Sequence, residues 1–232
     1  SIHRRRFLWL SVGAAGAACL SQCSRDSTAI PFTQPTSSPL LSSSNSGLLE
    51  ATLIARSEQI QLGQRQGTFV TYNGKIPGPR LEAKPGDTVR IRFSNRLQQA
   101  TNLHYHGLHI PPTGNADNIF LEVAPGATQI YEFTLPKNHP AGTFFYHPHL
   151  HKFTAEQVFG GLGGIFVVRG ELDAIPEVQA AREEFLFLKD LALDASGQIP
   201  SPRPMDLMRG REGSILTVNG QLNPSIAMPA QG

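Results

Sequence analysis

Two short motifs place pairs of histidines where they could bind a transition metal. His104 and His106 stand two residues apart, and His147 and His149 repeat this spacing. Side chains at positions i and i+2 of a strand leave the same face, about 6.5–7 Å apart at the backbone, so two imidazoles can converge on one metal ion or on two neighbouring ions. Four neutral imidazoles with no cysteine or carboxylate in the motifs suit copper or zinc. Intrinsic affinity favours Cu(II), although ligand type alone does not exclude zinc.

The residues beside the motifs indicate how the histidines are held. Gly107 follows the first pair and would let the backbone approach a packed neighbour. Pro148 separates the second pair and cannot donate a ladder hydrogen bond, so we expect that pair at a strand end or edge. Tyr105 should lie on the opposite face of its strand from the two histidines around it.

Three further histidines fall near these motifs. His109 leaves the other face from His104 if its strand continues, whereas His151 shares the parity of His149 and is a candidate for touching the metal. His139 stands in the turn-like sequence Lys-Asn-His-Pro and is expected to be solvated.

The segment that carries the motifs has the pattern of an all-β domain. Val89, Ile91 and Phe93 alternate with polar residues, as in a half-buried strand. No sustained helical period occurs between residues 49 and 170, apart from one turn near 154–158. Short strands between Pro- and Gly-containing turns predict a β-sandwich of roughly 120 residues. The strands are expected at 49–56, 68–72, 81–83, 88–95, 102–110, 129–135, 142–147 and 164–169.

Composition agrees with this class. The chain has 232 residues with 22 Gly and 18 Pro, which favours turn-rich β-structure over helix. The formal charge of +2 gives no reason to expect a nucleic-acid partner. Both cysteines fall before residue 24, so the mature chain is expected to offer no thiolate to a metal.

The first residues have the plan of an export signal. Arginines at 4–6 precede an apolar run at 8–20, which is shorter than the roughly 20 residues that span a bilayer. We therefore expect an export signal over 1–23, which resembles the twin-arginine type, with an ordinary Sec-type signal as the alternative.

A Ser-, Thr- and Pro-rich stretch at 24–48 predicts a flexible linker after this signal. We therefore expect the protein to be exported, to the periplasm or to another extracytoplasmic space. It would meet a membrane only through the signal or through a lipid on Cys19 or Cys23.

The character of the sequence changes after a first domain over 49–170. A short helix is expected within 171–182, and strands at 184–193 and 214–219. Because two strands do not complete a sheet, 171–232 is expected to be an incomplete second domain. An extension draped over the first domain is the alternative, but it would leave a strand edge bare.

Five stretches match one known pattern in order and spacing: YNGKIPGP at 72–79, PGDTV at 85–89, HYHG at 104–107, GTFFYHPH at 142–149 and GGLGG at 160–164. They closely resemble the N-terminal cupredoxin domain of the multicopper oxidases, a family that includes laccases, cuprous oxidases and bilirubin oxidases. The resemblance implies a cupredoxin-like Greek-key β-sandwich followed by the start of a second cupredoxin domain, in which TVNG at 217–220 is a familiar family stretch.

The resemblance also implies roles for the four histidines. His104 matches the ligand of the type 2 copper, and His106, His147 and His149 match ligands of the type 3 pair. In the family, an electron from the substrate enters at a type 1 copper held by a cysteine and two histidines. It passes to the trinuclear cluster, where dioxygen is reduced to water.

Part of that machinery is missing from these residues. Neither the H-x-x-H-x-H nor the H-C-H motif is present, so the type 1 site and four of the family's eight cluster histidines are absent from this chain. We expect the N-terminal part of an exported oxidase whose partners are dioxygen, a small reducing substrate and a missing C-terminal cupredoxin domain. Alone it would bind copper without turnover.

The histidines leave two alternative functions open. A non-catalytic copper-binding cupredoxin module would use the same ligands. A zinc hydrolase needs a general base beside an open metal position, and no Glu or Asp lies within either histidine motif.

Overall fold

The computed structural model of the chain describes residues 38–227. The expected export signal, both cysteines and most of the expected linker lie outside the described residues. Within the described range, none of the helices has the length and apolar character needed to cross a membrane.

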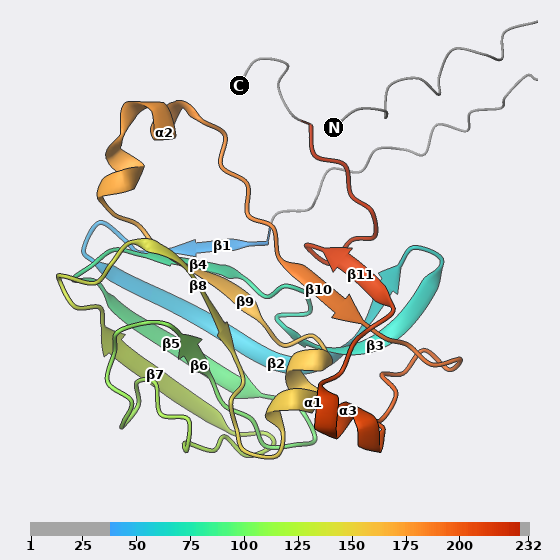
Figure 1. Ribbon diagram of the computed structural model, residues 1–232. Coiled ribbons are helices and arrows are strands. Elements are labelled where there is room, and N and C mark those ends of the chain that lie inside the picture. Colours follow the sequence, from blue (N-terminus) through green and yellow to red (C-terminus); the bar gives the residue numbers. More distant parts are fainter. Residues whose placement is uncertain (1–37, 228–232) are drawn as a thin grey trace, which may run out of the picture. The chain divides into compact units, whose positions relative to one another are not determined.

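Two β-sheets pack against each other as a sandwich (Figure 1). One sheet has the order β1 (Leu40–Ser42), β4 (Arg80–Ala83), β9 (Gly164–Val168), β8 (Gly142–His147) and β6 (His104–His106). The other has the order β3 (Arg65–Tyr72), β2 (Leu48–Leu62), β5 (Thr88–Asn95) and β7 (Thr128–Thr134). Parallel pairs such as β2–β5 and β4–β9 arise because the chain crosses between the sheets. The all-β sandwich expected from the sequence is confirmed.

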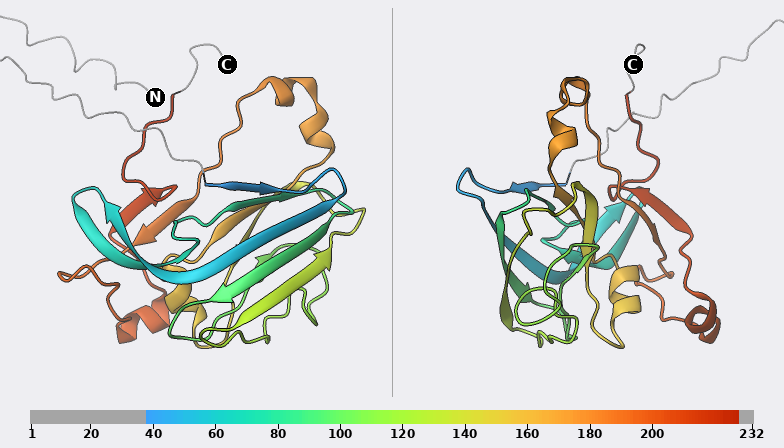
Figure 2. Two further views of the ribbon diagram at one scale, coloured as in Figure 1. Left: turned by 180° about the vertical axis from the view of Figure 1, so that it is seen from behind. Right: turned by 60° about the vertical axis from the view of Figure 1, so that its left-hand side comes forward.

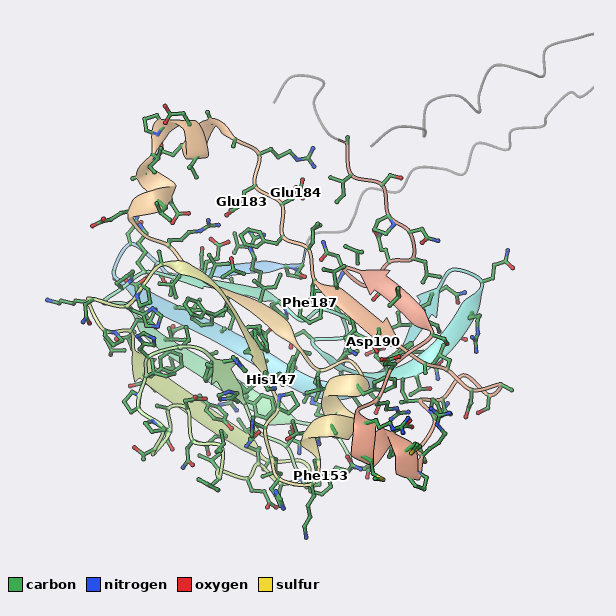
Figure 3. The ribbon with its side chains drawn as sticks, in the orientation of Figure 1. His147, Phe153, Glu183, Glu184, Phe187 and Asp190 are labelled. Carbon is green, nitrogen blue, oxygen red and sulfur yellow. The ribbon has the colours of Figure 1, made fainter. Side chains whose placement is uncertain are left out.

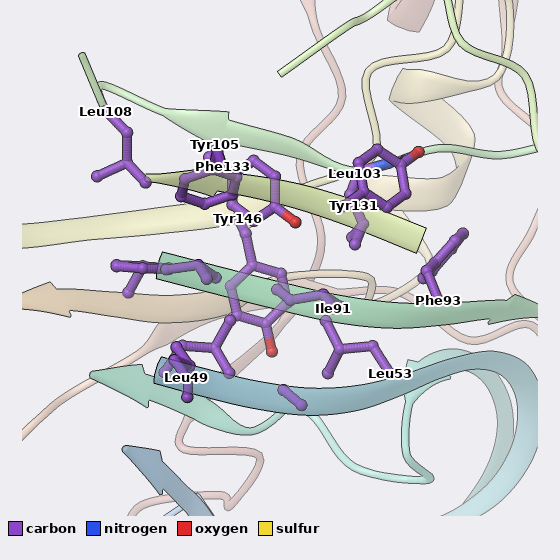
Figure 4. Close-up of a cluster of buried hydrophobic side chains, with 14 of the residues drawn as sticks. Leu49, Leu53, Ile91, Phe93, Leu103, Tyr105, Leu108, Tyr131, Phe133 and Tyr146 are labelled. Atoms are coloured by element: carbon purple, nitrogen blue, oxygen red, sulfur yellow. Dashed lines mark hydrogen bonds between the residues drawn. The ribbon is translucent and has the colours of Figure 1, made fainter. Parts of the chain in front are cut away.

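The core lies between the two sheets and is rich in tyrosine. Tyr72, Tyr105, Tyr131 and Tyr146 are wholly buried, and Figure 4 shows the last three among leucines and phenylalanines of both sheets. The rings of Tyr105 and Phe133 meet edge to face with centroids 4.8 Å apart, a favourable aromatic arrangement. Tyr105 therefore faces the core, as expected, and anchors strand β6 between two histidines.

Strand β6 is much shorter than the strand expected over 102–110. It ends at His106 because Gly107 takes a left-handed φ of +87° and the Leu108 N–H donates to the Tyr105 carbonyl at 3.3 Å. A Cβ at Gly107 would lie 3.0 Å from Cδ1 of Phe144, so the expected close approach is confirmed. Strand parity cannot be extended past this turn to His109.

The last part of the 24–48 segment is ordered rather than a free spacer. Strand β1 pairs in parallel with β4, with Leu40 opposite Arg80. The Ser43 N–H continues this pairing by donating to the Glu82 carbonyl at 3.0 Å. The apolar Leu40 and Leu41 among serines are the only sequence signal for this strand.

The helices are short. α1 (Thr154–Phe159) forms where one turn was expected, and η1 (Glu171–Ala174) with α2 (Pro176–Ala180) forms within 171–182. The segment that carries α2 projects from the sandwich in both views of Figure 2. Strands β10 (Leu188–Leu191) and β11 (Ile215–Val218) form a separate antiparallel pair, and α3 (Pro204–Arg209) lies between them in the sequence.

The antiparallel pair β10–β11 repeats the pairing of β2 with β3. Asn73 follows β3 and Asn219 follows β11, with left-handed φ values of 55° and 51°, and a glycine comes next in both. Oδ1 of Asn73 accepts from the Ile54 N–H at 2.7 Å, and Oδ1 of Asn219 accepts from the Phe187 N–H at 2.8 Å. In each strand pair, the residue before the asparagine pairs with the residue that follows this donor. The two strand pairs thus share one pairing register, and the same Asn-Gly turn follows the second strand of each.

Candidate metal centre

Strands β6 and β8 bring the two histidine motifs together. They are antiparallel neighbours, with His104 opposite His147 and His106 opposite Phe145. Figure 3 marks His147, the last residue of β8. Because the chain leaves the strand after His147, the second motif lies at a strand end, as Pro148 led us to expect.

The four predicted ligands form one cluster. His104, His106 and His147 each present a ring nitrogen, and these three nitrogens lie within 4.8 Å of one another. The ring centroid of His149 is 5.0 Å from that of His104 and 6.0 Å from that of His147. Three imidazoles therefore converge, and the fourth flanks them.

Hydrogen bonds fix which ring nitrogens stay free. His104 Nδ1 donates to the carboxylate of Asp117 at 2.9 and 3.0 Å, and His147 Nδ1 donates to the Pro148 carbonyl at 2.9 Å. Each ring then keeps its lone pair on Nε2. Nδ1 of His106 lies 3.4 Å from Nε2 of His147, which is too long for a strong hydrogen bond. In His104 and His147, one ring nitrogen is hydrogen-bonded to the protein and the other is free, which is usual for metal-binding histidines.

Asp117 is the main site residue that the motifs did not predict. The motifs contain no carboxylate, but the loop after β6 returns Asp117 to the first histidine, where the Tyr105 N–H also donates to its Oδ1 at 2.9 Å. No spacing rule links positions 104 and 117. Since both carboxylate oxygens are engaged, Asp117 orients His104 and is not a free general base for a zinc hydrolase.

Phe145 covers one side of the cluster. Its ring stacks on His106 with centroids 4.4 Å apart and planes 17° apart, and on His147 at 5.2 Å and 19°. The side chain is 42% exposed, so it forms an apolar rim beside the imidazoles. Its position two residues before His147, on the same strand face, was the available sequence signal.

Burial keeps His147 neutral. Burial, with a smaller contribution from the nearby His104, His106 and His149, lowers the pKa of His147 from its ordinary 6.5 to about 4. The hydrogen bond to the Pro148 carbonyl opposes this shift. A neutral imidazole at neutral pH is the form that binds a metal.

The remaining histidines near the motifs are arranged differently. His139 was expected to be solvated, but it is 4% exposed: its Nε2 accepts from the His109 N–H at 3.0 Å, and its Nδ1 donates to the Pro140 carbonyl at 2.8 Å. Both ring nitrogens are used, so His139 is a structural residue. His151 is exposed and, among the described residues, does not belong to the convergent group.

The donor set fits copper. The convergent groups are imidazoles, and two of them are oriented through their second nitrogen by a carboxylate or a backbone carbonyl. Imidazole is a good ligand for Cu(II), and such partners raise its basicity.

Comparison with known proteins agrees with this geometry. The family model described as multicopper oxidase matches residues 54–173, which is more than half of the chain. A multicopper oxidase from Staphylococcus epidermidis is 29% identical over 185 residues, covering 78% of this chain and 40% of that protein. The cell division protein FtsP of Xenorhabdus nematophila is 30% identical over 238 residues, covering 97% of this chain and 47% of that protein.

A solved structure of a multicopper oxidase has the same fold. The multicopper oxidase from Campylobacter jejuni, described as a metallo-oxidase, is 36% identical with a TM-score of 0.71, over 83% of this chain and 41% of that one. The chain thus spans less than half the length of these relatives, and its sandwich is the cupredoxin-like fold that the sequence predicted. The chain belongs to the multicopper oxidase family.

Proposed function

We propose that this chain is the N-terminal, copper-binding part of an exported multicopper oxidase that oxidises a small reducing substrate and reduces dioxygen to water at a trinuclear copper cluster. The observation that carries the proposal is the convergence of His104, His106 and His147, with His149 beside them, on neighbouring strands. Copper, when bound there, supplies one-electron redox chemistry.

The geometry supports separate roles for the histidines. His104 binds the type 2 copper, and the carboxylate of Asp117 fixes its tautomer and orientation. His106, His147 and His149 serve the type 3 pair, and the 3.4 Å separation between ring nitrogens of the first two is short enough for both to bind one ion of that pair. The type 1 site and the other four cluster histidines are supplied by polypeptide outside these 232 residues, and the chain alone binds copper without turnover.

We assign residues 171–232 to the start of a second cupredoxin domain. The repeated strand pairing supports this assignment, because Leu186 and Leu188 take the places of Leu53 and Ala55 in the β2–β3 pair. Leu53 and Ala55 are wholly buried in the first sandwich, whereas Leu186 is 44% and Leu188 76% exposed. A second sandwich would bury both leucines. The twin-arginine-like leader supports export of the protein to the periplasm or another extracytoplasmic space.

The test is oxygen consumption by the complete protein with a phenolic substrate. His147→Ala should abolish dioxygen reduction and leave the blue absorption of the type 1 copper intact, because that site is elsewhere. His151→Ala, an exposed histidine close by, is the control and should keep activity. Unchanged turnover in His147→Ala would rule out the ligand assignment.

A second candidate function is a copper-binding cupredoxin module without catalysis. The relative named as a cell division protein favours it, because it matches 97% of this chain and its name describes no oxidase. The same measurement separates the two functions, since a module without catalysis would bind copper but consume no oxygen in the complete protein.

A further inference from the structure

Asn102 joins two segments of the metal centre through one buried side chain. It is wholly buried, two residues before His104. Its Oδ1 accepts from the backbone N–H of His149 at 2.7 Å, and its Nδ2 donates to the carbonyl of Ile119 at 2.8 Å. Both polar groups of the amide are used, so the side chain is held in one orientation.

Each of these bonds leads to a copper-binding histidine. Ile119 lies two residues after Asp117, which accepts a hydrogen bond from His104. The Nδ2 bond to the Ile119 carbonyl therefore fixes the loop that orients His104. Strand β8 ends at His147, and the sheet therefore does not determine the backbone position of His149. The Oδ1 bond holds that backbone instead.

We infer that Asn102 is a positioning residue of the copper site. It sets the separation of His149 from His104, whose ring centroids lie 5.0 Å apart, and thereby the affinity and geometry with which copper is held. Partners that orient metal ligands commonly contribute 10- to 100-fold to metal affinity, so Asn102→Ala should weaken copper binding by about this factor. The inference rests on the proposed copper site.

Asn95 provides a matched control. It is also a wholly buried asparagine, and its side chain bonds to the carbonyls of Gln99 and Val123 and to the Leu97 N–H. Within the described residues, none of these partners forms a hydrogen bond to a histidine of the cluster. Asn95→Ala should destabilise the fold as Asn102→Ala does, because each leaves buried polar groups unpaired, but it should not change the copper site.

The experiment is a Cu(II) titration of the 232-residue chain and of both variants, at a temperature at which circular dichroism shows all three folded. Electron paramagnetic resonance of the copper-loaded samples reports the ligand geometry. The expected result is a 10- to 100-fold weaker affinity and an altered spectrum for Asn102→Ala, with Asn95→Ala matching the unaltered chain. If Asn102→Ala does not fold, Asn102→Thr and Asn95→Thr are compared in the same way.

The outcomes separate the inference from the proposed function. If the unaltered chain takes up no copper, the copper site and the role of Asn102 both fail. If the chain binds copper and the Asn102 variant binds it with the same affinity and spectrum, only the role of Asn102 fails. If Asn95→Ala weakens copper binding as much as Asn102→Ala does, the role of Asn102 is also rejected, because the lower affinity would then follow from lost stability.

Discussion

The Nδ1 atom of His104 lies 2.9 Å from Oδ1 and 3.0 Å from Oδ2 of Asp117. Donation through Nδ1 leaves Nε2 as the ring atom with a free lone pair. A carboxylate partner also makes a metal-binding imidazole more basic. One loop residue therefore sets the tautomer and the ligand strength of the first histidine in the cluster.

Asp117→Asn should weaken copper binding. The amide oxygen can still accept from His104 Nδ1, but the negative charge is lost, and a decrease of about 10- to 100-fold in Cu(II) affinity is expected by titration calorimetry. Asp194→Asn is the control, because Asp194 is exposed and its side chain bonds within its own turn to Ser196 and Gln198. Equal affinities for the Asp117 variant and the unaltered chain would contradict this role.

Acid should destabilise the metal-free protein through His147. Because the pKa of His147 is lowered to about 4 in the folded chain and is 6.5 in the unfolded chain, the unfolded state binds more protons between these values. The contribution to stability is complete above pH 6.5 and is lost as the pH falls toward 4. Urea unfolding in the presence of a chelator measures this. Between pH 6.5 and 4, the free energy of unfolding should fall less for His147→Asn than for the unaltered chain. An equal loss in both proteins would show that this histidine is not the cause.

Tyr105→Phe should not destabilise the protein. Within residues 38–227, the buried Tyr105 hydroxyl has no hydrogen-bond partner, so its removal is expected to leave the free energy of unfolding unchanged or to raise it by up to about 1 kcal/mol. Tyr131→Phe is the matched control: the Tyr131 hydroxyl accepts from the Leu103 N–H at 3.1 Å, and its loss should cost about 1–3 kcal/mol. Urea unfolding measures both, and a larger loss for Tyr105→Phe would contradict the assignment.

Arg169 should anchor the segment after the first sandwich. Its guanidinium binds Glu82, Asp173 and Glu183, and its side chain is only 22% exposed. Arg169→Met is expected to cost about 1.5–3 kcal/mol, because the largely buried carboxylate of Glu82 loses its hydrogen bonds to Arg169 and keeps only Arg80 as a partner.

Arg90→Met is the comparison for this anchor. Arg90 binds Glu50 and Glu132 on the exposed sheet face, with its own side chain 44% exposed, and its loss should lower the free energy of unfolding by clearly less than the loss of Arg169. Equal effects on urea unfolding would show that burial does not strengthen the Arg169 network.

Regular patterns in the sequence predicted most of the sandwich. The alternation of Val89, Ile91 and Phe93 corresponds to a buried face of β5, and most predicted strands lie within a few residues of the observed ones. The strand over 102–110 was too long because the pattern did not reveal the left-handed turn at Gly107. Strand β1 was missed because a three-residue edge strand leaves almost no periodic signal.

The site was predictable only where its residues are close in sequence. The His-x-His spacing gave four candidate ligands, which the fold brings together. Asp117 and Asn102 were not predicted, since they reach the histidines through long-range hydrogen bonds that leave no fixed spacing. The prediction that His139 is solvated was wrong for the same reason, because its ring accepts a hydrogen bond from the His109 N–H, 30 residues away.

The most direct test is copper binding by the 232-residue chain in which all four candidate ligands, His104, His106, His147 and His149, are replaced by alanine. The unaltered chain and a His109→Ala, His151→Ala double variant should bind Cu(II) with equal affinity and show nitrogen ligands by electron paramagnetic resonance. The fourfold variant should lose this binding. Copper binding by the fourfold variant with the affinity of the unaltered chain would contradict the assignment of the site.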